Sequence, residues 1–418
     1  ATGRHPHEIR HWDNAMPYTG AVPGWGHALQ AAGVPVESIG KLHYRDVADE
    51  DGFDRKHVPM MVADGVGMVW GSIRDAEHRH TPPKRMLGAY IGPGDSNYTR
   101  YDTAVVERAV DWIAAHKDDA APWCLYVGLV APHFPLVVPQ RFFDMYPPGT
   151  LPEPKLQPRH GHPRHPWVEA QNAQMDSEAN FADEDERLRA LSAYYGLCSW
   201  LDYNVGQILS ALKAAGLEDD TTVVYTSDHG DNAGTRGLWG KSNLYEESAA
   251  IPMIMAGPGV AAGTCDTLVN LIDLSKTIAT HFDVPVEGND MARALPQIAA
   301  DAYDETRVAF SEYHAVGALS GAFMLRRGRW KLIHYVGFED ELFDLENDPE
   351  ETTNLAAHPD MADVLQALHA ELRAICDPEA VNAQAFADQD ALIARFGGRD
   401  AAINLGAPGA TPPPKVLT

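Results

Sequence analysis

The chain has 418 residues and a formal net charge of −26, from 59 acidic and 33 basic side chains. This excess of negative charge disfavours binding to the phosphate backbone of nucleic acids. No stretch of about 18 apolar residues occurs, so the sequence predicts no membrane span. The four cysteines are scattered and do not form a disulfide framework.

The first third of the chain predicts two helices and one buried strand. Residues 25–32 read as a helix that Gly33 ends, and residues 102–116 as an amphipathic helix. Between them, Lys41 and His43 stand two residues apart, so in an extended segment both side chains would point to the same side. The apolar run 123–130 is typical of a buried strand in a parallel sheet, and it leads into His133, which lies between two prolines.

The middle of the chain carries the most informative motif. A long helix is predicted over residues 186–215, followed by a β-branched strand over residues 221–226 and then by Ser-Asp-His-Gly-Asp at 227–231. Asp228 offers a hard oxygen ligand, and His229 could serve either as a nitrogen ligand or as a donor to an anionic substrate. Lys241 follows Asp228 by thirteen residues. An ordinary turn after a strand is the competing interpretation of Asp-His-Gly.

The remaining chain predicts further strands and helices. Residues 251–256 read as another buried strand, residues 273–282 as a helix with Asp273 as its N-cap, and residues 322–335 as a hairpin around Arg327 and Gly328. A short antiparallel unit ending in Asn-Asp-Pro at 347–349, a helix over 361–376 and an aperiodic tail over 397–418 complete the chain. The order of strand, helix and strand favours a mostly parallel sheet with sites at the carboxyl ends of its strands.

Two segments have competing interpretations. Asp75-Ala-Glu-His-Arg-His80 invites a metal-site hypothesis, but a solvated loop is favoured because no later ligand completes the cluster. Trp12 could stack on a cationic head group or be a buried structural residue. Because the protein is so acidic, an anionic substrate must be bound by local cations, for which Arg4, Lys41, His43, His133, Lys241 and a metal are the candidates.

Four motifs in one order resemble a known family. Gly-Lys-x-His at 40–43, Ala-Pro-His-x-Pro at 131–135, Ser-Asp-His-Gly with its lysine, and Trp-Lys-Leu with Leu-Phe-Asp-Leu-x-Asn-Asp-Pro resemble the formylglycine-dependent sulfatases of the alkaline phosphatase superfamily. The opening residues 2–15 look similar to the choline-sulfatase-like branch. The resemblance implies a mostly parallel sheet flanked by helices over residues 1–304, a smaller antiparallel α+β subdomain over 305–394 and a tail over 395–418.

The resemblance also implies a reaction and roles for residues. The protein would hydrolyse a small organic sulfate ester to an alcohol and sulfate, with Asp228 and His229 on the metal side. Lys241 and His133 would act at the leaving oxygen and the sulfate, and Lys41 and His43 near the formylglycine. The metal would be calcium first, with manganese or magnesium as alternatives.

None of the four cysteines lies in the family's C/S-x-P/A-x-R motif, so we expect the formylglycine and the first metal-binding strand in an upstream segment. A phosphonate monoester or phosphodiester hydrolase and a non-catalytic anion-binding homologue are the competing functions. We also expect a homo-oligomer and a cytoplasmic location, with the periplasm as the alternative.

Overall fold

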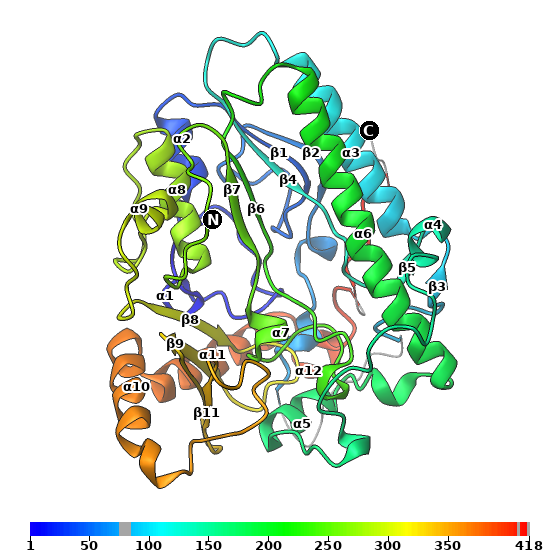
Figure 1. The fold of residues 1–418 in the computed structure, drawn as a ribbon, viewed down its shortest axis with the longest axis vertical. Coiled ribbons are helices and arrows are strands. Elements are labelled where there is room, and N and C mark those ends of the chain that lie inside the picture. Colours follow the sequence, from blue (N-terminus) through cyan, green and yellow to red (C-terminus); the bar gives the residue numbers. More distant parts are fainter. Residues whose placement is uncertain (75–84, 408–409, 416–418) are drawn as a thin grey trace.

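The computed structural model describes residues 1–74, 85–407 and 410–415 as an α/β structure in which a sheet-and-helix body adjoins a smaller antiparallel sheet (Figure 1). The segment Asp75–His80, for which a solvated loop was expected, lies outside the described residues. No helix among the described residues combines the length and apolarity needed to cross a bilayer.

The central sheet is parallel. Its three strands are ordered β2–β1–β4, with bounds β1 (Val36–Lys41), β2 (Arg55–Met60) and β4 (Cys124–Gly128). Strand β1 is in the middle of the three and its apolar side chains are buried, as expected for a parallel strand. A Cβ atom added to Gly40 would lie 2.2 Å from the carbonyl oxygen of Gly128, so only glycine lets the two strands approach at this end.

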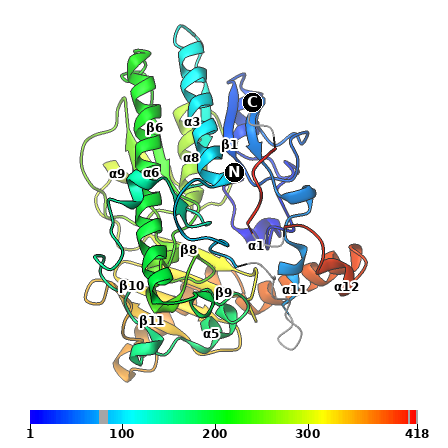
Figure 2. The same ribbon diagram turned by 90° about the vertical axis from the view of Figure 1, so that its right-hand side faces the viewer.

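Two long helices pack together against this sheet, α3 (Asn97–Ala115) and α6 (Glu184–Ala214) (Figures 1 and 2). Helix α3 begins at Asn97, ahead of the predicted start at residue 102, because Ser96 is its N-cap and accepts a hydrogen bond from the Thr99 amide at 3.0 Å. Side chains of α3, α6 and the parallel strands form one apolar cluster that includes Ile39, Val105 and Leu212.

The strand that leads to the Asp-His-Gly motif is β6 (Val223–Thr226), and it pairs with β7 (Met253–Ala256), antiparallel to it. The prediction that residues 251–256 form a buried strand was wrong, since Ile254 is 58% exposed. Tyr126 in β4 is also exposed. Among the described residues, neither the edge of β4 opposite β1 nor the edge of β6 opposite β7 carries another strand.

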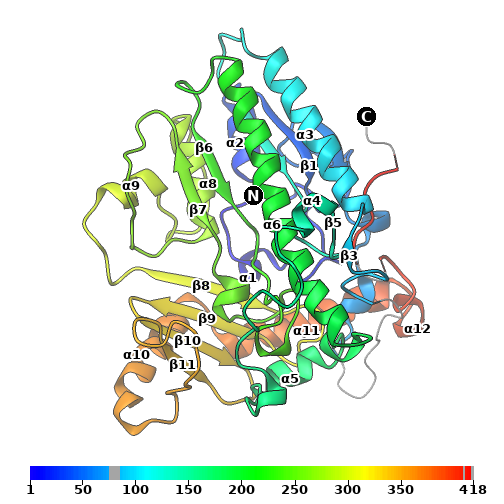
Figure 3. The same cartoon turned by 45° about the vertical axis from the view of Figure 1, so that its right-hand side comes forward.

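The C-terminal sheet is antiparallel and confirms the expected hairpin at Arg327 and Gly328. Its strands are ordered β11–β10–β9–β8, with bounds β8 (Val308–Tyr313), β9 (Ala322–Arg327), β10 (Trp330–Tyr335) and β11 (Glu341–Asp344). Helix α10 (Ala362–Ile375) packs on it through Leu368 and Leu372. Figure 3 shows α10 and α11 (Pro378–Arg395) at this end of the molecule.

A buried ion group joins the C-terminal sheet to the body. Lys331 of β10 is fully buried, and its ammonium group lies 2.7 Å from Glu246 Oε1 and 2.6 Å from Glu351 Oε1. Glu246 begins helix α7 (Glu246–Ala249), which follows the segment that carries Lys241. The contact therefore fixes the C-terminal sheet against the loop after β6.

The prediction that Asp273 is the N-cap of helix α8 (Leu271–His281) was wrong. The N-cap is Asn270, and Asp273, three residues later, accepts a hydrogen bond from the Asn270 amide, as in a capping box. The described residues also form α1 (Pro6–Ile9), α2 (Trp25–Ala31), β3 (Gly92–Pro93), β5 (Val137–Val138), α4 (Gln140–Phe143), α5 (Pro166–Asn172), α9 (Leu295–Ala300), α12 (Arg399–Ala402) and several 3₁₀ turns.

Candidate active site

Polar side chains gather beyond the carboxyl ends of three strands. Lys41 ends β1, His133 lies in the loop after β4, and Asp228 follows β6. The charge of Lys41 lies close enough to shift the pKa values of Asp228, His133 and Lys241. We call the two lysines, Lys41 and Lys241, together with the neighbouring rings of His43 and His133, the cationic cluster, and Asp228 with His229 the acidic pair.

His133 and Lys241 form a direct contact. The Lys241 ammonium group donates to His133 Nε2 at 2.8 Å, while His133 Nδ1 donates to the carbonyl oxygen of Phe134 at 2.7 Å. The two hydrogen bonds assign the neutral tautomer with its proton on Nδ1. Burial, followed by the Lys241 and Lys41 charges, lowers the pKa of His133 well below its usual value, which keeps the ring neutral.

Lys241 is poised to lose a proton more readily than an ordinary lysine. Burial lowers its pKa to about 8, and the neighbouring charge of Lys41 acts in the same direction. The ammonium form therefore predominates at neutral pH while remaining a better acid than a solvated lysine. Its hydrogen bond to His133 uses one of its three protons, which leaves two for a ligand.

The loop that carries His133 is held from helix α3. The buried carboxylate of Asp102 accepts hydrogen bonds from the amides of Val130 and Ala131 at 2.8 and 2.9 Å. Burial raises the pKa of Asp102 to about 6, against the opposing effect of these two amides. The X-Pro bonds on both sides of His133 are cis.

The loop that carries Lys241 is closed on itself. Asp231 Oδ1 accepts the amides of Ala233 and Gly240 at 2.8 and 3.0 Å, and the amide of Asn232 donates to the Gly240 carbonyl oxygen at 2.7 Å. These bonds hold the segment from Asp231 to Gly240 as a closed loop, so Lys241 lies near Asp228 although it comes thirteen residues later in the sequence.

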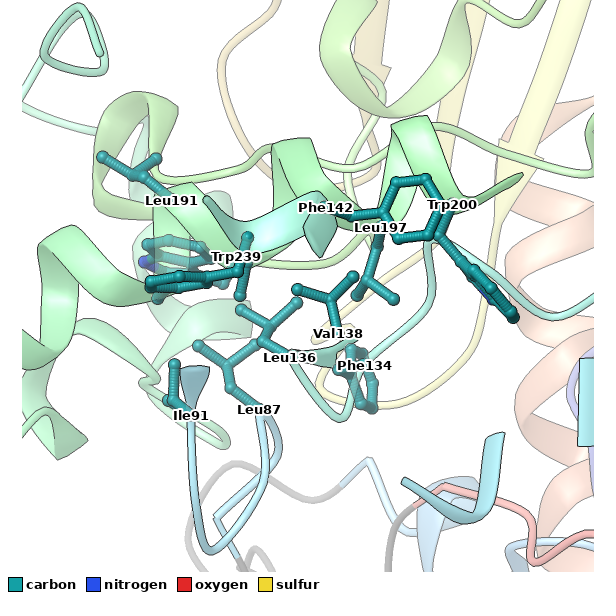
Figure 4. Packing of buried hydrophobic residues seen from close by; sticks show 13 residues of the cluster. Leu87, Ile91, Phe134, Leu136, Val138, Phe142, Leu191, Leu197, Trp200 and Trp239 are labelled. Atoms are coloured by element: carbon teal, nitrogen blue, oxygen red, sulfur yellow. The ribbon is translucent and has the colours of Figure 1, made fainter. Parts of the chain in front are cut away.

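The same apolar core anchors both loops. Phe134 and Leu136 follow His133, Trp239 precedes Lys241, and all three belong to one buried cluster with Leu87, Ile91, Leu191 and Leu197 (Figure 4). In Figure 4, Leu136 lies between Trp239 and Phe134. The contact between His133 and Lys241 is therefore supported by packing from both of its sides.

His43 does not have the extended conformation that the sequence predicts, and contacts with other segments hold its ring. Its φ angle is +60°, so the chain turns there, and its amide donates to the Met60 carbonyl oxygen at 2.9 Å. Its Nε2 lies 2.8 Å from the hydroxyl of Thr411, a buried residue of the C-terminal tail. Burial, followed by the charges of Lys41 and Lys241, lowers the pKa of His43 to about 3, so this ring is neutral at physiological pH.

The acidic pair lies in the turn after β6. A Cβ atom on Gly230 would lie 2.1 Å from the Glu247 carbonyl oxygen, so glycine is needed where the turn meets α7. The Asp228 side chain is 68% exposed and its Oδ2 lies 3.5 Å from His229 Nε2. Desolvation raises the pKa of Asp228, but nearby positive charge, chiefly that of Lys41, outweighs it and leaves the pKa below its usual value.

The acidic pair fits a metal ion. His229 Nδ1 donates to the Gly230 carbonyl oxygen at 2.8 Å, which leaves the lone pair of Nε2 beside the Asp228 carboxylate. Burial, followed by the charge of Lys241, lowers the pKa of His229, so the ring is neutral and two acceptor atoms face each other. A cation between the two acceptor atoms would accept a lone pair from each, and carboxylate oxygen and imidazole nitrogen are common metal ligands in proteins.

Two residues that the sequence suggested for substrate binding lie outside this site. Arg4 pairs with Glu287 at 3.7 Å, on the side where α8 packs, and it is not among the charges that shift the pKa values of the cationic cluster. Trp12 is 4% exposed and its indole donates to Asp388 at 2.8 Å, so it is the buried structural residue and not a surface for a cationic head group.

Sequence reasoning missed Asp102, Tyr98 and Thr411. Asp102 could have been found, since it is a carboxylate on the apolar face of an amphipathic helix, where an unpaired charge is costly. Tyr98 donates to the Thr411 carbonyl oxygen, and its ring lies 5.9 Å from that of His133. Nothing in the aperiodic tail signals the position of Thr411.

Comparison with known proteins identifies a family. The family model described as "Sulfatase" matches residues 2–284, and the model "N-sulphoglucosamine sulphohydrolase, C-terminal" matches residues 234–377. The chain is 29% identical to a choline-sulfatase of Rhizobium meliloti (strain 1021) over 380 residues, which covers 85% of this chain and 72% of the relative. It is 27% identical to arylsulfatase K of Danio rerio, over 91% of this chain and 74% of that one.

Solved structures share the fold. A phosphonate monoester hydrolase from Silicibacter pomeroyi superposes with a TM-score of 0.67 at 21% identity, covering 89% of this chain and 83% of its own. The structure of BT4656 in complex with its substrate D-glucosamine-2-N,6-O-disulfate gives a TM-score of 0.65 at 20% identity, covering 93% and 87% of the two chains. At these identities the superpositions establish the architecture.

Proposed function

The chain belongs to the sulfatase family, and from this premise we propose that the cationic cluster and the acidic pair form its active site. The protein is a sulfuric-ester hydrolase that cleaves an organic sulfate ester to an alcohol and sulfate. The observation that carries the assignment of residues is the contact between Lys241 and His133, since it places a proton donor of lowered pKa near the acidic pair.

The first task of the site is to bind an anionic group in an acidic protein. A sulfate monoester keeps one negative charge, and Lys41 and Lys241 supply fixed positive charge near Asp228. Two unit charges about 4 Å apart interact by roughly 4 kcal/mol at an effective dielectric constant of 20. Two lysines can therefore outweigh the long-range repulsion of a chain with a net charge of −26.

The second task is to stabilise the leaving oxygen. As the ester bond breaks, negative charge develops on the alcohol oxygen, and Lys241 neutralises it by hydrogen bonding or by proton transfer. His133 cannot donate from Nε2, because that atom accepts from Lys241. We therefore assign proton donation to Lys241, and to His133 the task of orienting the ammonium group.

His43 is suited to the opposite role. Its ring is neutral, since its pKa is lowered to about 3, first by burial and then by Lys41. A neutral imidazole in this position could accept a proton during the release of sulfate. Lys41 lies close enough to act on the pKa of this ring and would hold the sulfate during the same step.

We propose that Asp228 and His229 hold one divalent cation. Bound there, such an ion would supply a Lewis acid that neutralises sulfate oxygens. The family resemblance favours calcium, with manganese and magnesium as alternatives, and direct binding by His229 Nε2 would favour manganese because calcium prefers oxygen ligands. Analysis of calcium, manganese and magnesium in the full-length protein should find about one equivalent of one of them, which Asp228→Ala abolishes and the exposed-residue control Asp219→Ala retains.

We further propose that the nucleophile is a formylglycine supplied by chain outside residues 1–418. No cysteine or serine of these residues stands in a C/S-x-P/A-x-R motif. Among the described residues the outer edges of β4 and β6 carry no further strand, which supports this proposal, because a strand added parallel to either would end beside the cationic cluster. Mass spectrometry of the full-length protein should show a cysteine or serine converted to the aldehyde.

The reaction class is tested by comparing matched substrates. The full-length protein should turn over an aryl sulfate faster than the aryl phosphonate monoester with the same leaving group. A faster phosphonate reaction would support a phosphonate monoester or phosphodiester hydrolase, and no turnover of either, together with no formylglycine, would support an anion-binding homologue. The homo-oligomer expected from the sequence stays a prediction, which light scattering would check.

A further inference from the structure

A second group of metal-binding side chains lies in the C-terminal sheet, apart from the active site. His334 is near the end of β10, Asp340 immediately precedes β11, and His369 lies in the middle of α10. Asp340 Oδ1 accepts from His334 Nδ1 at 2.7 Å, and Asp340 Oδ2 accepts from His369 Nε2 at 2.6 Å. One donor atom from each residue lies within 4.8 Å of the other two.

The arrangement is close to that of a bound transition metal. The two imidazole rings are nearly perpendicular, at 83°, with centroids 5.3 Å apart, and each directs a nitrogen towards the same carboxylate. In a tetrahedral zinc site with bonds of about 2.0–2.1 Å, neighbouring ligand atoms are about 3.3 Å apart. The two hydrogen bonds would give way to this spacing, and side-chain rotation would bring together the ligand atoms, which now lie within 4.8 Å of one another.

The groups around these side chains also suit a metal. His334 Nε2 is buried and has no hydrogen-bond partner in the part of the chain that the structure describes, and Glu379 Oε1 lies 3.9 Å away, held by two hydrogen bonds from Arg373. Histidine ligands commonly direct their second ring nitrogen to such a carboxylate.

We propose that His334, Asp340 and His369 bind one zinc ion, which joins helix α10 to the turn between β10 and β11. Two nitrogen ligands and one carboxylate suit zinc and disfavour calcium or magnesium, which prefer oxygen. The side chains are 12%, 17% and 26% exposed, so water can occupy the fourth position and the ion can enter from solvent.

The ion would act as a structural link. Helix α10 already packs on the sheet through Leu368 and Leu372, and the Asp340 turn is held by Asn354, whose side chain donates to the Asp340 carbonyl oxygen at 3.0 Å. The ligands are thus held in place before the ion arrives, so binding requires little rearrangement. Because only the folded chain holds all three ligands together, zinc would stabilise the folded state by mass action.

The test measures zinc binding directly, without reference to activity. The full-length protein is freed of metal with a chelator and titrated with zinc chloride by calorimetry, as wild type, His369→Gln and the control His358→Gln. His369→Gln keeps an N–H donor for Asp340 but removes the ligand, and His358 is an exposed histidine in the segment that leads into α10. We expect His369→Gln to bind one equivalent fewer, or that equivalent at least tenfold more weakly, and the control to match wild type.

Two further measurements separate this site from the acidic pair. Zinc should raise the melting temperature of wild type and of Asp228→Ala, and should raise that of His369→Gln by much less. With cobalt in place of zinc, wild type should show the visible absorption of a four-coordinate site, which His369→Gln loses. Equal zinc binding by His369→Gln and wild type, or loss of the same equivalent in Asp228→Ala alone, would overturn the proposal. Asp340→Asn, which keeps an acceptor oxygen, provides a second variant if His369→Gln does not fold.

Discussion

The ammonium group of Lys241 donates a hydrogen bond to His133 Nε2 at 2.8 Å, although 108 residues separate the two in the sequence. The imidazole passes no proton back, because its own N–H is used by the Phe134 carbonyl oxygen. Of the two side chains, Lys241 is therefore the one that can donate a proton to a ligand.

The first prediction concerns Lys241→Ala. Removing the proton donor should slow hydrolysis of alkyl sulfates, whose leaving groups need protonation, by about 10²–10⁴-fold, and should slow activated aryl sulfates much less. Values of kcat/KM for a series of esters with different leaving-group pKa values would check this. The exposed Lys213→Ala should leave the series unchanged, and equal losses for all esters would argue against proton donation by Lys241.

The second prediction concerns pH. Burial lowers the pKa of Lys241 to about 8, so the proton that the leaving oxygen needs is present below that pH and is lost above it. The rate for alkyl sulfates should therefore fall as the pH rises through about 8, and Lys241→Arg should remove this alkaline limb because guanidinium stays protonated. A profile that stays flat to pH 10 would contradict the assignment.

The third prediction concerns Asp102, which positions His133 through the backbone. Asp102→Asn keeps one acceptor oxygen but directs an N–H group at one of the two amides, which leaves a buried donor unsatisfied at a cost of about 1–3 kcal/mol. The melting temperature should fall. Because the change acts through His133, hydrolysis of alkyl sulfates should fall more than that of activated esters, whereas a purely structural loss would reduce both rates equally.

The fourth prediction concerns the buried ion group around Lys331. Lys331→Met removes the cation between Glu246 and Glu351 and leaves two carboxylates without it, so the free energy of unfolding should fall by roughly 3–5 kcal/mol. Denaturant titration would measure the change, with Lys213→Met as the exposed control. A fall in the free energy of unfolding of less than about 1 kcal/mol would contradict this prediction, because it would mean that protonation or hydration of the two carboxylates replaces the lysine.

Much of the fold could be predicted because local patterns agree with the final packing. The hairpin at Arg327 and Gly328 and the long helix before β6 both appeared where their periodicity placed them. The start of α3 and the cap of α8 could not be placed as well, because Ser96 and Asn270 compete with neighbouring residues that cap equally well in isolation. Nor could the exposure of Ile254, which depends on what pairs with its strand and not on its own sequence.

For the candidate site, strand ends were the useful signal. Residues at the carboxyl ends of parallel strands reach the same edge of a sheet, so the approach of Lys41 and His133 follows from the pairing of β1 with β4. The contact between His43 and Thr411 spans 368 residues and joins a strand end to an aperiodic tail, so no periodicity could reveal it. The catalytic roles of these residues stay predictions, for which the substitutions above provide tests.

The shared core beneath the two loops has a consequence for how such a site can change. Trp239, Leu136 and Phe134 fix where the ammonium and imidazole groups meet, yet they belong to a buried cluster. Natural selection on turnover must therefore also act on the volume of these inner side chains. Variation in substrate preference would be easier to acquire on the Thr411 side, where a single hydroxyl and an aperiodic segment border the site, than beneath the lysine.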